Sequence, residues 1–381
     1  MDPRSHRCWR HGPRGDVLRR QGGRGLHPRD AGTADAGAGP VAVEQHSRRL
    51  LQNYVGFKST GAEIRGSSAF DIALWDLFGK VVDQPIYQLL GGKCRDRIRV
   101  YNTCAGYRYV RARPTQRLED WGLENKDGPY EDLDGFLNRA DELAESLLSE
   151  GYRGMKIWPF DFAAEASYGT DISAEDLKKA VQPFEKIRKR VGDRIDIHVE
   201  LHSMWQLPAA IKIARALEPF EPYWFEDPIK MSNLDAIKRF RESTRVWVTA
   251  SETLATRWAF RELFEKGATS VAMLDIGWCG GLSEAKKIAT MAECHELPVA
   301  PHDCTGPGLL TASVHLCMAS PNALVQEVVR AFYFGWYQEL VDNLPPLKDG
   351  YIEPPEGPGL GLTLRPGLHQ RPDARSRISE L

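Results

Sequence analysis

The sequence has little that would mark a membrane-bound or nucleic-acid-binding protein. Its 50 Lys and Arg nearly balance 52 Asp and Glu, and the formal net charge of −2 gives no electrostatic basis for binding nucleic acid or an anionic membrane. No apolar run approaches the roughly 20 residues that a membrane-spanning helix needs, and no charged-then-apolar signal peptide begins the chain. We therefore expect neither a nucleic-acid nor a membrane partner.

Cysteine is sparse and shows no pairing pattern. The seven cysteines are odd in number and form no CxxC pair. Disulfide-dense and zinc-ribbon classes are therefore excluded, and we expect reduced thiols in a cytoplasmic protein.

Lysine is missing from the start of the chain and first occurs at Lys58. Residues 1–40 hold eight Arg, eight Gly and four Pro, with no periodicity that would build a core. This composition predicts a disordered or non-native leader. One hypothesis is an out-of-frame translation of a GC-rich coding region. The tail, 346–381, looks similarly aberrant after about residue 361.

In contrast to these absences, polar and charged residues recur at regular intervals along the chain, and we call this set the ladder. From Glu200 onward the successive gaps are 26, 26, 23, 27 and 25 residues, about one strand, one helix and two short loops. Each residue ends a short run rich in β-branched or aromatic side chains, as expected of strands alternating with helices. The ladder consists of Lys156, Glu200, Glu226, Glu252, Asp275, His302 and Glu327.

Eight such runs are present, which predicts an α/β fold, a TIM-like (β/α) barrel over residues 96–345. An open α/β sheet is the alternative, but it rarely brings six consecutive strand ends to one point, whereas a closed barrel gathers them at one mouth. Helical periodicity over residues 41–95 predicts a small helical unit ahead of the barrel. The expected strands are 98–104, 154–158, 195–200, 223–226, 246–252, 270–275, 297–302 and 323–327.

The third run shows which side chains face inward. Polar and aliphatic residues alternate over 196–202, and strand side chains alternate between faces. Asp196, His198, Glu200 and His202 are therefore predicted to point into the barrel. For the deeper Asp196 and His198 we expect a satisfied internal hydrogen-bond pair; for Glu200 and His202, nearer the mouth, a functional role.

Three glutamates on successive strands would repel one another unless a cation joined them. Carboxylate oxygens suit a hard ion, so Glu200, Glu226 and Glu252 predict an Mg²⁺ site, with Mn²⁺ possible. A zinc hydrolase is a weaker alternative, because zinc favours His or Cys ligands.

Asp275 and His302 end adjacent strands, which lie roughly 4.8 Å apart in a sheet. A hydrogen bond between them would fix the imidazole tautomer and raise its basicity. His302 is therefore predicted to be a general base.

Together these motifs, with the run of residues 70–80 (FDIALWDLFGK), resemble the mandelate racemase subgroup of the enolase superfamily over about residues 41–361. The resemblance implies an enolase-type barrel and Mg²⁺-assisted removal of the proton α to a carboxylate, and members of this superfamily are a known case of pairing a Lys or His base with Mg²⁺. It implies that Lys156 supplies positive charge, and that Glu327 hydrogen-bonds the substrate carboxylate as a protonated or proton-sharing group. It also implies a homo-oligomer, and an N-terminal capping domain that is truncated or aberrant here.

Two departures indicate the subclass. Racemases of the subgroup resemble Lys-x-Lys at the second strand, but here Trp158 replaces the second Lys and cannot take a proton. His202 lies two residues after Glu200, similar to a His that acts as general acid in galactonate and mannonate dehydratases. We therefore predict a hydro-lyase that dehydrates a sugar acid, an aldonate or aldarate, to a 2-keto-3-deoxy sugar acid. A sugar-acid epimerase or racemase and a catalytically defective relative remain as alternatives.

Overall fold

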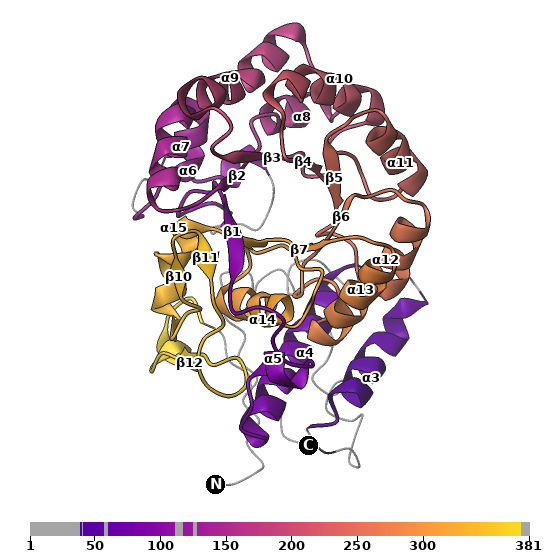
Figure 1. Cartoon of the computed structure of the whole chain (residues 1–381), viewed down its shortest axis with the longest axis vertical. Coiled ribbons are helices and arrows are strands. Elements are labelled where there is room, and N and C mark those ends of the chain that lie inside the picture. Colours follow the sequence, from indigo (N-terminus) through magenta and orange to yellow (C-terminus); the bar gives the residue numbers. More distant parts are fainter. Residues whose placement is uncertain (1–38, 40, 57–59, 111–116, 125–127, 375–381) are drawn as a thin grey trace.

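The fold is that of a computed structural model, which describes residues 39, 41–56, 60–110, 117–124 and 128–374. The predicted leader therefore lies almost wholly outside the described residues. Eight parallel segments form the centre of the molecule, and helices surround them on the outside (Figure 1). The strands are β1 (Ile98–Thr103), β2 (Gly154–Ile157), β3 (Asp196–Glu200), β4 (Trp224–Glu226), β5 (Trp247–Ala250), β6 (Val271–Leu274), β7 (Val299–Pro301) and β8 (Gln326–Val328).

The strands follow chain order from β1 to β7, and β8 pairs in parallel with β1. An isolated parallel bridge between Val299 and Ala323 joins β7 to the residues that lead into β8. The eight segments therefore close into a ring, and the barrel predicted from the ladder is confirmed. Each of the eight expected strands is present.

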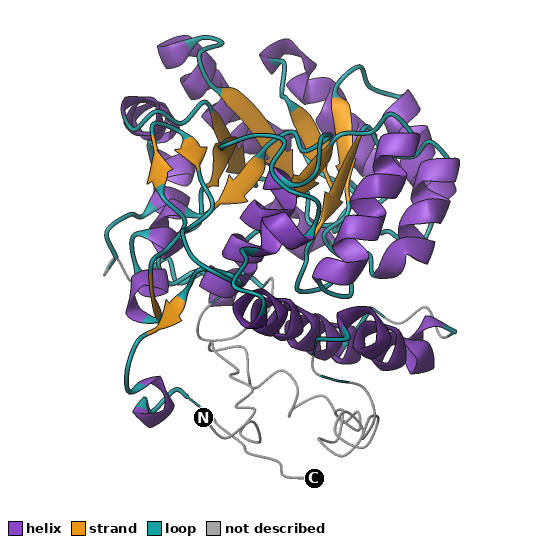
Figure 2. Ribbon diagram, turned by 60° about the horizontal axis from the view of Figure 1, so that its bottom comes forward, coloured by secondary structure: helices purple, strands orange, loops and turns teal. Residues whose placement is uncertain are grey.

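Helices lie around the outside of the strands (Figure 2). Their buried apolar residues form one core with those of the strands. The longest, α9, begins where the Ser173 side chain accepts a hydrogen bond from the Asp176 N–H (3.0 Å), and it ends at Gly192, whose φ is 62°. The barrel helices are α6 (Asp132–Asn138), α7 (Ala140–Ser149), α8 (Asp161–Ser167), α9 (Ala174–Val191), α10 (Leu207–Leu217), α11 (Leu234–Glu242), α12 (Thr256–Glu265), α13 (Leu282–Cys294), α14 (Pro307–Met318) and α15 (Arg330–Tyr333).

Inside the ring lies a second, smaller apolar cluster. It fills the barrel interior below the polar strand ends, so the mouth rests on a packed floor and not on a pore. Its buried members come from β1, β4, β6 and β7 and from the residue just before β8: Tyr101, Trp224, Val271, Met273, Ala300 and Val325.

Among the described residues, three helices precede the barrel, and no strand occurs before β1: the helices are α3 (Val43–Val55), α4 (Ala62–Val81) and α5 (Ile86–Leu89). One face of α4 docks on the connection that follows β6. Ser68 Oγ accepts the Gly280 N–H (3.0 Å), Asp71 accepts the Ser283 N–H (3.0 Å), and the Trp75 indole donates to Ser283 (2.9 Å). The N-terminal unit is thereby fixed to the segment that carries Asp275.

The tail also packs on the molecule as far as it is described. Short strands β9 (Val341–Asp342) and β12 (Thr363–Leu364) pair antiparallel, β10 (Leu347–Lys348) pairs with β11 (Tyr351–Ile352), and β11 pairs with β1. These contacts describe the fold of the tail and not the origin of its sequence, so the aberrant character expected after about residue 361 stays a prediction. Across the described part of the chain, no helix combines the length and apolar character needed to cross a membrane.

Candidate active site

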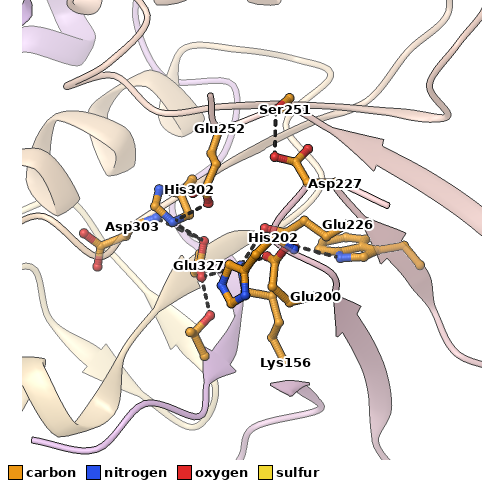
Figure 3. Close-up of polar contacts among 12 residues, drawn as sticks. Lys156, Glu200, His202, Glu226, Asp227, Ser251, Glu252, His302, Asp303 and Glu327 are labelled. Atoms are coloured by element: carbon orange, nitrogen blue, oxygen red, sulfur yellow. Dashed lines mark hydrogen bonds and ion pairs between the residues drawn. The ribbon is translucent and has the colours of Figure 1, made fainter. Parts of the chain in front are cut away.

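The ladder residues meet at one end of the barrel because parallel strands present their carboxyl ends to the same side (Figure 3). Glu200 and Glu226 lie directly opposite each other in the β3–β4 register, and Lys156 lies opposite Thr103 between β2 and β1. Glu252, Asp275 and His302 follow their strands by one or two residues.

Glu200, Glu226 and Glu252 offer carboxylate oxygens that all lie within 4.8 Å of one another. The three residues are at most 8% exposed. Burial, followed by repulsion from Glu200, raises the pKa of Glu226 well above its usual value. Among the described residues no other group of His, Cys, Asp or Glu meets the same proximity criterion.

This cluster fits a hard divalent cation. Oε2 of Glu200 is buried and accepts no hydrogen bond from the described residues; its contact with Lys156 Nζ is an ion pair at 3.3 Å, so it keeps lone pairs for a ligand. The donor set is all carboxylate, which suits Mg²⁺ or Mn²⁺ and disfavours zinc. One divalent charge would offset most of the repulsion among the three groups.

Lys156 reaches into the cluster from β2 and is 2% exposed. Its Nζ lies 2.6 Å from Glu226 Oε1, 2.9 Å from Glu327 Oε1 and 3.3 Å from Glu200 Oε2. Burial opposes the charge, but Glu226 and then Glu327 outweigh it and raise the pKa of Lys156. The ammonium group therefore adds a fixed positive charge beside the three glutamates.

On the other side of the cluster, His302 Nδ1 lies 2.7 Å from Asp275 Oδ2 and its Nε2 lies 2.8 Å from Glu252 Oε2. Because a carboxylate only accepts, Nδ1 donates to Asp275 and Nε2, the atom that faces the cluster, donates to Glu252 in this arrangement. Burial opposes imidazole protonation, but Glu252 outweighs it and raises the pKa of His302. The Trp278 ring packs 5.3 Å from the imidazole.

Glu327 is fully buried and held at both oxygens. Thr103 donates to Oε1, and the Asp303 N–H donates to Oε2 (3.1 Å). Although burial disfavours the carboxylate, Lys156 and His302 lower the pKa of Glu327 below its usual value. Glu327 is therefore ionised in this state, and the protonated form expected with a bound substrate stays a prediction.

His202 does not continue strand β3, which ends at Glu200. Its backbone turns, with φ of 49°, and its N–H donates to Glu200 Oε1 (2.7 Å). Its ring still lies in the site, with Nδ1 2.7 Å from Asp161 Oδ2. Burial opposes protonation, but Asp161 and Glu200 raise the pKa of His202 to about 9.

The expected hydrogen-bond pair of Asp196 and His198 is wrong. Asp196 Oδ2 instead accepts from Arg99 on β1 (3.0 Å), and His198 Nδ1 has no hydrogen-bond partner. The His198 ring packs against Tyr101 and Trp224 at 4.4 and 4.1 Å between centroids, in the floor of the barrel. The aromatic surroundings of His198 were not predicted, because the residue pattern of one strand does not show which side chains the other strands contribute.

The sequence did not predict several residues that contact the candidate site. Trp224 donates its indole N–H to Glu226 Oε2 (3.1 Å), and alternation along β4 would have placed it inside with Glu226. Asp227 accepts from Ser251 (2.7 Å) directly after Glu226, and Asp303 contacts Glu327 directly after His302. The signal for both acids was their position next to a ladder residue.

Comparison with known proteins identifies the family of the domains that carry this site. Residues 139–368 match the enolase C-terminal domain-like family, and residues 37–91 match the mandelate racemase / muconate lactonizing enzyme N-terminal domain. The catalytic and metal-binding roles of individual residues stay predictions, because the match is to the domains.

Curated relatives include a D-xylonate dehydratase from Haloferax volcanii, 30% identical over 334 residues, which cover 86% of this chain and 74% of that protein. A D-galactonate dehydratase from Ralstonia nicotianae is 30% identical over 306 residues, covering 79% and 72%. A crystal structure of an enolase of the mandelate racemase subgroup from Agrobacterium tumefaciens has a TM-score of 0.80 and 50% identity, covering 93% of this chain and 87% of that one. Both domains match, and the chain covers about three quarters of the length of the D-xylonate dehydratase. The chain therefore belongs to the mandelate racemase / muconate lactonizing enzyme family of the enolase superfamily.

Proposed function

We propose that the chain is a hydro-lyase that dehydrates a sugar acid, an aldonate or aldarate, to a 2-keto-3-deoxy sugar acid with Mg²⁺ as cofactor. The observation that carries the proposal is the presence of two imidazoles, His302 and His202, beside one cluster of three buried glutamates (Figure 3). The names of the relatives support it, since they include dehydratases of xylonate, galactonate, gluconate and arabinonate.

His302 removes the proton from C2. Its Nδ1–H is held by Asp275, so Nε2 is the nitrogen that would accept the proton, once Glu252 Oε2, 2.8 Å away, turns from it to a metal ion. Because a proton α to a carboxylate is far less acidic than an imidazolium, this base requires that the negative charge developing on the substrate be stabilised.

Glu200, Glu226 and Glu252 would hold Mg²⁺, which supplies Lewis-acid stabilisation of that charge when bound. Lys156 adds a second positive charge where an anionic substrate enters, since its ammonium already lies within 3.3 Å of three carboxylates. Glu327, held by Thr103 and the Asp303 N–H, is placed to meet the substrate carboxylate.

His202 protonates the C3 hydroxyl as it leaves. Loss of the C2 proton and the C3 hydroxyl gives an enol, which becomes the 2-keto product, with one water released. Racemisation with a lysine as the second base is disfavoured, because the position at which that lysine would act is occupied by Trp158. Epimerisation through His302 and His202 on opposite faces of the substrate is the second candidate function.

A screen of sugar acids with Mg²⁺ and a 2-keto acid assay tests the proposal, with His302→Asn as the inactive control. The expected result is turnover of one or a few acids by the wild type and a loss of about 10²-fold or more in the variant. Recovered C2 epimer without keto acid would favour the epimerase. Failure of every acid to react would favour a defective relative. We also propose that the protein is cytoplasmic and homo-oligomeric, with the domain boundaries inferred from the sequence.

A further inference from the structure

A buried carboxylate outside the metal cluster contacts the second imidazole. Asp161 is the first residue of α8, five positions beyond Lys156, and is fully buried. Its Oδ2 lies 2.7 Å from His202 Nδ1, and its Oδ1 has no hydrogen-bond partner among the residues that the structure describes. A buried carboxylate is costly unless it has a specific partner, and His202 is the partner that this one has.

This contact repeats the geometry of the Asp275–His302 pair. Asp275 Oδ2 lies 2.7 Å from His302 Nδ1, the same distance and the same ring atom. A carboxylate only accepts hydrogen bonds, so in both pairs Nδ1 donates to the carboxylate and Nε2 points away from it, in His302 toward Glu252 Oε2 at 2.8 Å. One pair comes from the β2 and β3 connections, the other from those after β6 and β7.

Two further contacts limit the freedom of His202. Its backbone N–H donates to Glu200 Oε1 (2.7 Å), which fixes the turn, and the Trp158 ring meets the imidazole edge to face at 5.7 Å and 76°. Neither contact selects the ring nitrogen that faces the substrate. Only the Asp161 hydrogen bond distinguishes Nδ1 from Nε2.

We propose that Asp161 is a positioning residue that orients His202 with Nε2 toward the C3 hydroxyl of the substrate. The inference rests on the proposed function. Removal of the C2 proton leaves its electron pair on the substrate carboxylate, giving an enediolate intermediate. That pair then forms the C2=C3 bond as the C3–O bond breaks, and the oxygen leaves as water with the proton from His202 Nε2. His302 keeps the C2 proton, and Asp161 takes no proton in the step.

A positioning role and a merely structural role of Asp161 predict different effects on the two steps of the reaction. Proton removal at C2 needs His302, and departure of the C3 hydroxyl needs His202. Loss of the Asp161 hydrogen bond therefore slows elimination and spares proton removal, so the intermediate returns to substrate more often. In D₂O that return is recorded as deuterium at C2 of the recovered substrate.

The test compares Asp161→Asn with the wild type in D₂O and Mg²⁺, followed by NMR. Elimination is expected to fall about 10²-fold, with the ratio of C2 exchange to elimination rising at least tenfold and KM little changed. Asp275→Asn should lose exchange and elimination together. Asp171→Asn, at an exposed carboxylate in the next loop, should keep both. Elimination at the wild-type rate in Asp161→Asn, or equal loss of both steps, would overturn the inference.

A spectroscopic measurement keeps the inference testable if no sugar acid reacts. The Nδ1 proton of His202, assigned by its absence in His202→Asn, is expected far downfield in the wild type and missing or strongly shifted in Asp161→Asn. An unchanged His202 Nδ1 resonance in Asp161→Asn would refute the positioning role whatever the substrate. Failure of turnover with the expected resonance change would count against the proposed function and not against the contact.

Discussion

The ammonium nitrogen of Lys156 lies 2.6 Å from Oε1 of Glu226, with both side chains buried in the barrel mouth. The chain thus places a permanent cation against a carboxylate that is also expected to bind a metal ion. Lys156 and the metal ion would share the same carboxylates, so a substitution of Lys156 should change the affinity of the site for the metal ion.

Lys156→Met should bind Mn²⁺ more tightly than the wild type and yet lose turnover. The reason for tighter binding is that the substitution removes a positive charge from the cation site, and the same loss leaves the anionic substrate without a partner. The metal-free variant should also be less stable by about 3–5 kcal/mol, because buried carboxylates lose their cation. Mn²⁺ titration and thermal unfolding with and without metal measure these effects. Lys179→Met, on the exposed face of α9, is the control. Weaker Mn²⁺ binding in Lys156→Met would contradict the shared-site interpretation.

Trp224→Phe should weaken Mn²⁺ binding by about 10–100-fold, because it removes the indole hydrogen bond that orients Glu226 and keeps an aromatic ring in the barrel floor. Trp121→Phe provides a matched control. Trp121 is as deeply buried, but its indole N–H has no hydrogen-bond partner. Equal Mn²⁺ affinities in the two variants would show that the indole does not orient the ligand.

His315 should make the protein labile in acid. Its Nδ1 accepts from the Tyr87 N–H (3.3 Å) and its Nε2 donates to the Leu360 carbonyl (3.2 Å), so the neutral ring joins α5 and the tail to α14. Burial lowers the pKa of His315 to about 4. Since the folded pKa lies below the unfolded value of about 6.5, the stabilisation is present above pH 6.5 and is lost as the pH falls toward 4, by about 3 kcal/mol.

Urea unfolding of the wild type and His315→Gln at several pH values measures this window. The stability advantage of the wild type should shrink between pH 6.5 and 4 and be constant above it. Two parallel pH profiles would mean that His315 does not contribute.

The ladder residues could be predicted because spacing and alternation are local properties of a chain. Glu200, Glu226 and Glu252 lie near the ends of consecutive strands, and a βα repeat of regular length suffices to bring them to one mouth. The pairing of Asp275 with His302 followed in the same way, from the adjacency of β6 and β7.

The contacts that the sequence could not predict come from other segments. Arg99 reaches Asp196 from β1, and Asp161 reaches His202 from the connection after β2. Neither partner has a fixed spacing from the residue it contacts. His202 shows a second limit: strand alternation predicted its inward direction, but the strand ends two residues earlier and a turned backbone brings it to the site.

The most direct test of the central claim is one NMR experiment, in which the chain, Mg²⁺ and a reactive sugar acid are incubated in D₂O. Dehydration by the proposed route predicts loss of the C2 proton, appearance of a 2-keto-3-deoxy acid with deuterium at C3, and no reaction with His302→Asn. Accumulation of a C2-deuterated epimer with no keto acid would contradict it.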